Sequence, residues 1–380
     1  MKKKCAKAIT TIDFIIRDTI LLYYNGTAKT VVIPDNVTIV NNNAFAGNKN
    51  LTKVILPNSV ITIKSGAFYS CNHLSSIIIT GNATMIEDLA FYHCPSLKEI
   101  LITSKNKKYK TIDGLLYEYD QTNSCLKLKF CPTNKKGSCI LPENVTEIAR
   151  AAFLGCKNLT SITLPYGIKK LENRIFCDCT HLKSIAIPNS VTELGDWVFL
   201  GCKSLKTLTI PNHVTIIGKA AFADCSSLTE LTIPDSVTGL GDFLFINCAH
   251  LIRITIPSNV KNIMPNMFDS CPSLKEIIVN GKDTYISFDG VLFKKTKVGL
   301  NLIFYPANKK EKSYIIPKNV TSIMNYAFIH CQYLTSVTIP DNIVSIEKYA
   351  FYDCNDDLTI FYSSPIPLIK NKKSIKKSSA

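Results

Sequence analysis

The chain has 380 residues, of which 46% are hydrophobic and 19% are charged, and it carries a formal net charge of +15 at pH 7. This hydrophobic content excludes an intrinsically disordered protein, and no apolar run approaches the ~18 residues of a transmembrane helix. The positive charge is concentrated in residues 1–10, 104–141, 281–316 and 361–380, so the rest of the chain is close to neutral.

The N-terminus, MKKKCAKAITTIDFIIRDTILLYY, starts with basic residues and continues with an apolar stretch, like a secretory signal peptide. Asp13, Arg17 and Asp18 interrupt that stretch, whereas a signal peptide needs an unbroken apolar region of about 7–15 residues. We therefore expect no cleaved signal. Both a surface or secreted location and a cytoplasmic location stay open.

From residue 34 onward the chain repeats with a period of 23 residues. Apolar residues such as Leu205, Leu208 and Ile210 precede a proline position, which indicates a short strand that proline ends. A phenylalanine follows 11 residues after that position, in a tight or helical turn, and points into the coil. One coil cannot bury its apolar residues alone, so stacked coils are expected to share a continuous core. Thirteen coils start at positions 34, 57, 80, 103, 142, 165, 188, 211, 234, 257, 280, 317 and 340.

Ten of the 15 cysteines occupy one position of the repeat, 14 residues after the proline position. The first coil has Asn48 there, and asparagine and cysteine share a small size and a hydrogen-bond donor. We therefore predict an architectural role, in which these side chains satisfy backbone carbonyls inside the coil. Disulfides between adjacent coils are geometrically possible, but a regular buried column favours free thiols and a reducing compartment. This cysteine column consists of Cys71, Cys94, Cys156, Cys179, Cys202, Cys225, Cys248, Cys271, Cys331 and Cys354.

Two similar inserts, at about residues 104–141 and 281–316, interrupt the period. Each contains a DG dipeptide between apolar stretches and then a second stretch closed by proline and lysines, which predicts an inserted β-hairpin. Residues 1–33 contain a degenerate third copy with Asp18 at the DG position, and are expected to cap the first coil. The solenoid then spans residues 34–364, and the basic residues 365–380 are expected to form a disordered tail.

The pattern IPxxVxxIxxxAFxxCxxLxxI resembles the repeat of the BspA-type leucine-rich repeat family, roughly over residues 30–360. The resemblance implies a β-rich α/β repeat fold, a leucine-rich-repeat solenoid of about thirteen 23-residue coils with two inserted β-hairpins. It also implies a function. Members of this family are surface antigens and adhesins of bacteria and parasitic protists, and they bind host or matrix proteins without catalytic activity.

Residues two positions before the proline position should point outward from the strands and form a candidate protein-binding face. This column is apolar in the N-terminal coils, and it becomes a threonine ladder, suited to sheet geometry, in the middle. The apolar strip is either covered by the neighbouring hairpin or exposed to a partner. A neighbouring column carries scattered charges of both signs, which favours a protein partner over a polyanion. The candidate residues are Ile55, Ile78, Leu101, Thr163, Thr209, Thr232 and Thr255, with Glu230 and Arg253 from the neighbouring column.

Five of the six histidines lie near the cysteine column, but other coils place lysine or serine at the same positions. No CxxC pair stands near a second ligand pair, so we predict no metal site. Cys177, Cys179 and His181 form the densest cluster, yet a cysteine nucleophile also needs an orienting group and a pocket. We predict no catalytic residue and no cofactor. Lysine-rich segments are usually solvated, so nucleic acid is not the expected partner.

The sequence thus predicts a non-enzymatic protein-binding repeat protein that acts in adhesion or surface recognition. The alternative is an intracellular protein-interaction scaffold, which the interrupted signal-like stretch and the thiol column favour. Neither the partner nor the oligomeric state follows from the sequence.

Overall fold

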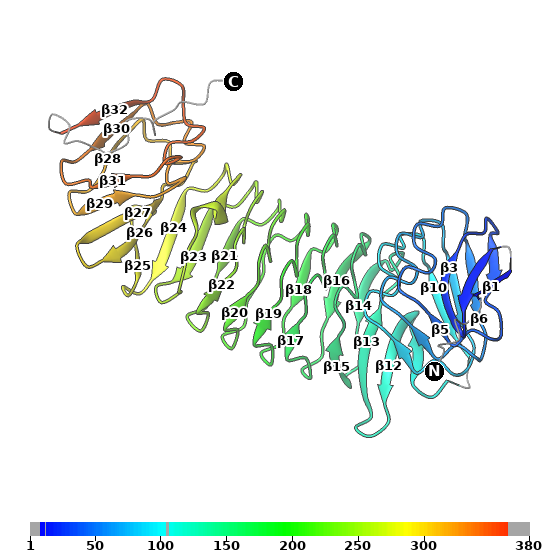
Figure 1. Ribbon diagram of the computed structural model, residues 1–380. Helices are drawn as coiled ribbons and strands as arrows, with labels where there is room; N and C mark the ends of the chain where they lie inside the picture. The colour runs from blue at the N-terminus through cyan, green and yellow to red at the C-terminus, as the bar shows by residue number, and fades with distance from the viewer. Residues whose placement is uncertain (1–7, 12, 104–105, 364–380) are drawn as a thin grey trace, which may run out of the picture. The chain divides into compact units, whose positions relative to one another are not determined.

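The computed structural model describes residues 8–11, 13–103 and 106–363, and the predicted tail at 365–380 lies outside them. The chain divides into two compact units, residues 1–182 and 183–380. In both units most coils contribute to two sets of parallel strands and to one turn segment, which confirms the predicted β-rich solenoid (Figure 1). We call the strands that precede the proline position the first ladder and the shorter strands that follow it the second ladder. The only helix in the described part of the chain is the 3₁₀-helix η1 (Pro265–Phe268).

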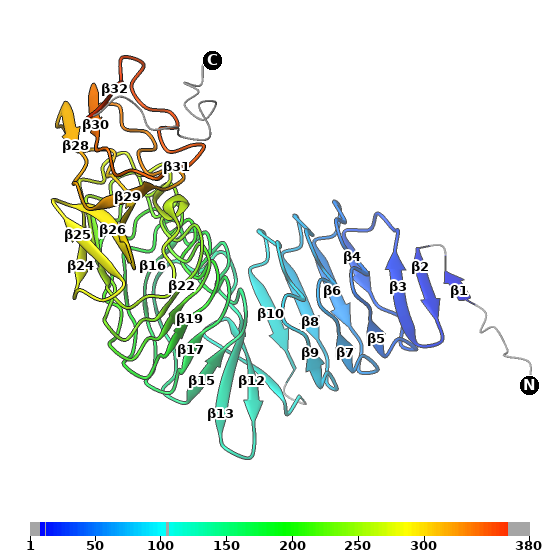
Figure 2. The same cartoon turned by 60° about the vertical axis from the view of Figure 1, so that its left-hand side comes forward.

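In the first ladder of the N-terminal unit, side chains alternate between the core and the outer surface. Val54 and Leu56 are buried, and Ile55 between them faces outward. The strands of this ladder are β4 (Thr30–Val32), β6 (Lys53–Leu56), β8 (Ser76–Ile79), β10 (Glu99–Ile102), β14 (Gly137–Ile140) and β16 (Leu159–Thr163). The second ladder has β3 (Ile20–Tyr24), β5 (Ile39–Val40), β7 (Thr62–Ile63), β9 (Met85–Ile86), β15 (Val145–Ile148) and β17 (Lys170–Leu171). Figure 2 shows β4, β6, β8 and β10 side by side.

The C-terminal unit repeats this arrangement. Its first ladder contains β18 (Ser184–Ala186), β21 (Glu230–Thr232), β23 (Arg253–Pro257), β24 (Glu276–Asn280), β28 (Ser313–Ile315), β30 (Ser336–Ile339) and β32 (Thr359–Tyr362). Its second ladder contains β19 (Glu193–Leu194), β20 (Ile216–Ile217), β22 (Gly239–Leu240), β29 (Val320–Ile323) and β31 (Ser345–Ile346). Residues 205–210, where the repeat predicts a strand, form none.

Each insert forms an antiparallel three-stranded meander in the second ladder, one strand more than the predicted hairpin. The first has β11 (Tyr109–Ile112), β12 (Leu115–Asp120) and β13 (Cys125–Phe130), and the second has β25 (Tyr285–Phe288), β26 (Val291–Thr296) and β27 (Gly299–Phe304). The DG dipeptides make the two-residue turns, because Asp113 and Asp289 have φ of 50° and 49° and the glycines after them 80° and 72°. Positive φ at both central residues is the signature of a type I′ turn. The last strands, β13 and β27, rejoin the parallel ladder beside β15 and β29.

Where each meander begins, a tyrosine hydroxyl accepts a backbone hydrogen bond from the coil before the insert. The Ile86 N–H of β9 donates to the hydroxyl of Tyr109 at 2.8 Å, and the Ile263 N–H donates to the hydroxyl of Tyr285 at 3.0 Å. A buried amide without a partner costs about 1–3 kcal/mol. The tyrosines therefore replace the hydrogen bond that the next coil would otherwise supply.

The N-terminal segment also forms a meander, of β1 (Ala8–Thr11), β2 (Phe14–Arg17) and β3. Its third strand, β3, pairs in parallel with β5, as β13 does with β15. Asp18 lies in the turn between β2 and β3 and has φ of 56°. That turn corresponds to the loop between β12 and β13, so placing Asp18 at the DG position was wrong. A left-handed aspartate suits either turn, and the two cannot be told apart by residue type alone.

The turn segments carry the phenylalanines and the cysteine column. Phenylalanine rings of successive coils stack, with centroids 5.0 Å apart for Phe45 and Phe68 and 5.6 Å apart for Phe222 and Phe245. Seven of the column thiols donate to the phenylalanine carbonyl of the preceding coil, as Cys71 does to Phe45 at 3.0 Å. In the coils that follow the inserts the acceptor differs, since Cys156 donates to the Cys131 carbonyl at 3.7 Å and Cys331 to the Tyr305 carbonyl at 3.8 Å. In the first coil the Asn48 amide donates to the Gly26 carbonyl at 3.0 Å. These bonds confirm the architectural role predicted for the column.

Candidate protein-binding surface

In the N-terminal unit, the outward residues of the first ladder form one apolar column. The strand registers pair Val32 with Ile55, Ile55 with Ile78, and Ile78 with Leu101. Val32 is 59% exposed and Leu101 45% exposed, and the two isoleucines between them are half-buried. The insert therefore leaves this column accessible at both ends.

Beyond the first insert, the outward positions of β14 and β16 hold one apolar residue and one threonine. Ile140 is 70% exposed and pairs with the exposed Thr163. Exposed apolar side chains that recur in register are more informative than isolated ones, which are common on any protein surface.

In the C-terminal unit the predicted threonines lie where the repeat places them, with one exception. Thr232 and Thr255 pair on β21 and β23, and Ile278 continues the row on β24. Thr209 is exposed but lies in residues 205–210, which form no strand. A second row, of Ile315, Thr338 and Phe361, crosses β28, β30 and β32.

The neighbouring column combines charges of both signs. Glu230 pairs with Arg253 in the register of β21 and β23, and Arg253 also forms an ion pair with Glu276 on β24. The cation thus stands in a row with two carboxylates. This balance gives no single-sign field of the kind that binds polyanions.

Four outward residues were missed by the sequence analysis: Val32, Ile140, Ile315 and Phe361. The first three stand two positions before a proline, so the rule that found the others would have found them. Phe361 precedes no proline, and only its pairing with Thr338 reveals its place.

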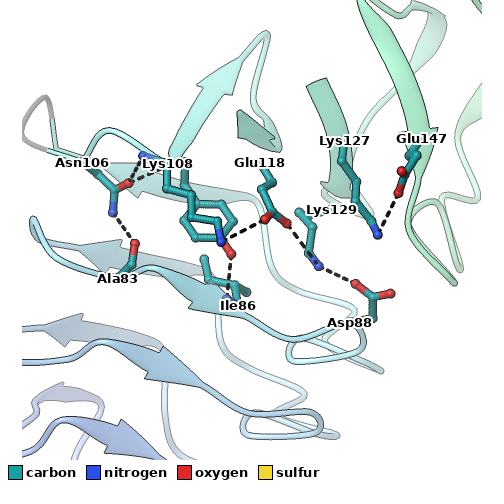
Figure 3. Close-up of polar contacts among 10 residues, drawn as sticks. Ala83, Ile86, Asp88, Asn106, Lys108, Glu118, Lys127, Lys129 and Glu147 are labelled. Atoms are coloured by element: carbon teal, nitrogen blue, oxygen red, sulfur yellow. Dashed lines mark hydrogen bonds and ion pairs between the residues drawn. The ribbon is translucent and has the colours of Figure 1, made fainter. Parts of the chain in front are cut away.

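Charged side chains of the first insert gather on one side of its meander. Figure 3 shows Lys129 of β13 between Asp88 and Glu118, with Lys127 reaching Glu147. The Lys129 side chain is only 7% exposed, and its ammonium is 3.9 Å from Glu118 and also pairs with Asp88. A buried lysine with two carboxylates is satisfied within the protein, so this cluster is structural.

Burial makes several of the cysteines poor nucleophiles at neutral pH. Burial raises the pKa of Cys71 to about 11 and the pKa values of Cys177 and Cys225 to about 12, in each case from 9.0. Only the thiolate reacts or binds a metal, so these thiols are inert. His181, in the densest predicted cluster, uses Nδ1 to contact the Lys157 carbonyl at 2.6 Å. Within the described residues, no group of three or more His, Cys, Asp or Glu side chains could hold a metal ion.

The family model described as "BspA type Leucine rich repeat region (6 copies)" matches residues 20–119, 127–215, 198–311 and 301–373. The chain belongs to the BspA-type leucine-rich repeat family. Among curated proteins none matches this BspA-type chain. In the part of the chain that the structure describes, no helix is long and apolar enough to cross a membrane.

Several solved structures are similar to this BspA-type protein. A leucine rich cell surface protein from Faecalibacterium prausnitzii A2-165 is 26% identical, with a TM-score of 0.42, over 94% of this chain and 76% of that one. The T. pallidum leucine-rich repeat protein TpLRR is 28% identical, with a TM-score of 0.41, over 45% of this chain and 81% of that one. A leucine-rich repeat protein from Bacteroides ovatus ATCC 8483 is 20% identical, with a TM-score of 0.47, over 94% and 98% of the two chains.

Proposed function

We propose that this BspA-type protein binds another protein through the outward residues of its first ladder, as a non-catalytic module for adhesion or surface recognition. The supporting observation is the column of Val32, Ile55, Ile78 and Leu101, which runs in register across four strands and is exposed at both ends. A rigid row of apolar side chains beside mixed charges suits a protein partner, because interfaces combine an apolar centre with a polar rim.

An intracellular protein-interaction scaffold is the second candidate. The cysteines among the described residues are all free, and most of them are buried. Free thiols in such number are typical of a reducing compartment. Protease treatment of intact source cells separates the two candidates, since a surface protein is digested before lysis and an intracellular one only after it.

The binding face is tested with single lysine substitutions and one matched control. Leu101→Lys on β10 and Thr232→Lys on β21 place a charge on the first ladder, whereas Ile216→Lys places the same charge on the exposed second ladder of β20. After partner capture, affinities are measured by surface plasmon resonance, with circular dichroism to verify folding. The first two should weaken binding about tenfold or more, as a buried charge costs at least ~1.4 kcal/mol. Unchanged affinity in both, or an equal loss with Ile216→Lys, would remove the first ladder as the recognition surface.

A further inference from the structure

The two inserts interrupt the turn segments in the same manner, and the first leaves an open cavity of about 260 Å³. It lies in the N-terminal unit, between the turn segment that contains Phe91 and the one that contains Gly155. The insert contributes Phe130 from the end of β13 to its lining. The corresponding place at the second insert lies between the turn segments of Asp269 and His330.

At the second insert a histidine fills this place. His330 Nε2 lies 3.0 Å from a carboxylate oxygen of Asp269, on the coil before the insert. Its Nδ1 lies 2.6 Å from a carboxylate oxygen of Asp353, on the following coil. Phe304, at the end of β27, is only 1% exposed. The imidazole therefore bridges the turn segments and completes the surface there.

At the first insert the same repeat position holds Gly155. Its backbone conformation matches that of His330, with φ of 70° against 58°, and both N–H groups donate to the next coil. A Cβ atom at Gly155 would meet nothing within 4 Å. Phe130, the counterpart of Phe304, is only partly buried. The cavity thus exists because a side chain that the fold accommodates elsewhere is absent.

The lining combines aromatic rings with charged side chains. Phe91 and Phe130 pack edge to face, with centroids 5.6 Å apart. Two of the charged lining residues are already engaged, since Lys129 pairs with Asp88 and Glu87 accepts the Ser65 N–H.

The remaining cations both come from the coil after the insert. Arg150 and Lys157 line the cavity and form no ion pair with any residue that the structure describes. Asp178, the other acid of the lining, comes from the coil beyond them. A guanidinium and an ammonium without partners favour a carboxylate ligand. The volume suits one large side chain, since whole-ligand pockets are about 300–1,000 Å³.

We propose that this cavity is an anchor site for an aromatic side chain next to a carboxylate on a protein partner, with the ring on Phe91 and Phe130 and the carboxylate on Arg150 and Lys157. The choice of a protein as the source of this group rests on the proposed function. The cavity lies in the turn segments and not on the first ladder. The binding test of the cavity and the binding test of the first ladder can therefore give a negative result independently of each other.

The test uses N-acetyl-phenylalanine as the probe and the full chain, with binding followed by ligand-observed NMR and calorimetry. A probe of this size should bind with a Kd on the order of 1 mM. N-acetyl-phenylalaninamide, which lacks the carboxylate, should bind about tenfold more weakly. Arg150 is exposed, so Arg150→Ala should not disturb the fold. This substitution should weaken binding of N-acetyl-phenylalanine by a similar factor and leave binding of the amide unchanged.

Two reciprocal substitutions at the matched position supply the control. Gly155→His copies the natural residue of the second insert and should abolish binding by filling the cavity. His330→Gly should open the second place, where Asn325 and Gln332 stand at the positions of Arg150 and Lys157 and where Asp269 and Asp353 lose their partner. This variant should leave binding of the acid unchanged. Equal binding to Gly155→His, equal binding of acid and amide, or no binding to the wild-type chain would each overturn the proposal. Thermal melts that match the wild type confirm that the variants are folded.

Discussion

Alkaline pH should destabilise this protein steeply, because burial holds its thiols protonated in the folded state. The pKa values of Cys71, Cys177 and Cys225 rise to about 11, 12 and 12 from 9.0. Above pH ~9 the thiols of the unfolded chain lose their protons, whereas the thiols of the folded chain keep theirs. The stability that the protonated thiols contribute is therefore fully present below pH ~9, and it is lost as the pH rises toward the pKa of the folded state. At pH ~10 the three thiols together cost on the order of 4 kcal/mol. That is a large share of the ~5–15 kcal/mol that stabilises a folded domain.

Urea unfolding followed by far-UV circular dichroism, at pH values from about 7.5 to 10 with a reductant, measures this loss. A triple variant with Cys71→Ala, Cys177→Ala and Cys225→Ala is the control. It should be less stable at neutral pH, since it loses buried sulfur atoms and two bonds to the Phe45 and Phe199 carbonyls. Its free energy of unfolding should nevertheless fall about 4 kcal/mol less over the same pH range. A wild-type free energy that is the same at pH ~8 and pH ~10 would refute the assignment of raised thiol pKa values.

Three further substitutions test how the inserts join the ladders. Gly290→Ala should destabilise by about 2–4 kcal/mol, since its φ is +72° and a Cβ would lie 2.9 Å from the Glu276 Cβ. Gly114→Ala, with φ of +80° and open space around it, should cost only about 1–2 kcal/mol, and equal losses in thermal or urea unfolding would contradict the packing difference. Tyr285→Phe should cost about 1–3 kcal/mol by leaving the Ile263 N–H without an acceptor, whereas a neutral effect would mean that water or another group replaces the hydroxyl.

The repeat made most of the fold predictable from the sequence. A period of 23 residues brings equivalent positions into register, so the alternation of residues before each proline position, as in Val54, Ile55 and Leu56, was enough to separate inward from outward residues. The chemical similarity of Asn48 to the cysteines predicted their hydrogen bonds to backbone carbonyls. The DG dipeptides predicted the turns, since Asp-Gly favours positive φ at both central positions.

Contacts between residues far apart in sequence were not predictable in the same way. Residues 308–310, Asn-Lys-Lys, follow the second meander and would be expected to be solvated. Lys309 is nevertheless buried, and its ammonium lies 3.0 Å from both the carbonyl and a carboxylate oxygen of Asp289. The sequence also gives no sign that Tyr109 and Tyr285 accept backbone N–H groups, because ring position depends on the meander geometry. The period predicts the contacts that all coils have in common, and it does not predict the contacts that form where an insert interrupts it.

The inserts that interrupt the period are the places where a solenoid of this kind can acquire a surface specific for one partner. Inside the array, each coil must offer the same phenylalanine and the same donor to its neighbours, so its core positions are fixed by packing. Next to an insert the turn segment loses its regular neighbour, and one residue then decides whether the place is closed, as with His330, or open, as with Gly155. The first ladder behaves similarly, because its apolar outward column ends at the exposed Leu101, in the last first-ladder strand before the first insert. A change at Gly155 or Leu101 therefore alters the surface without altering the stacking that holds the coils together.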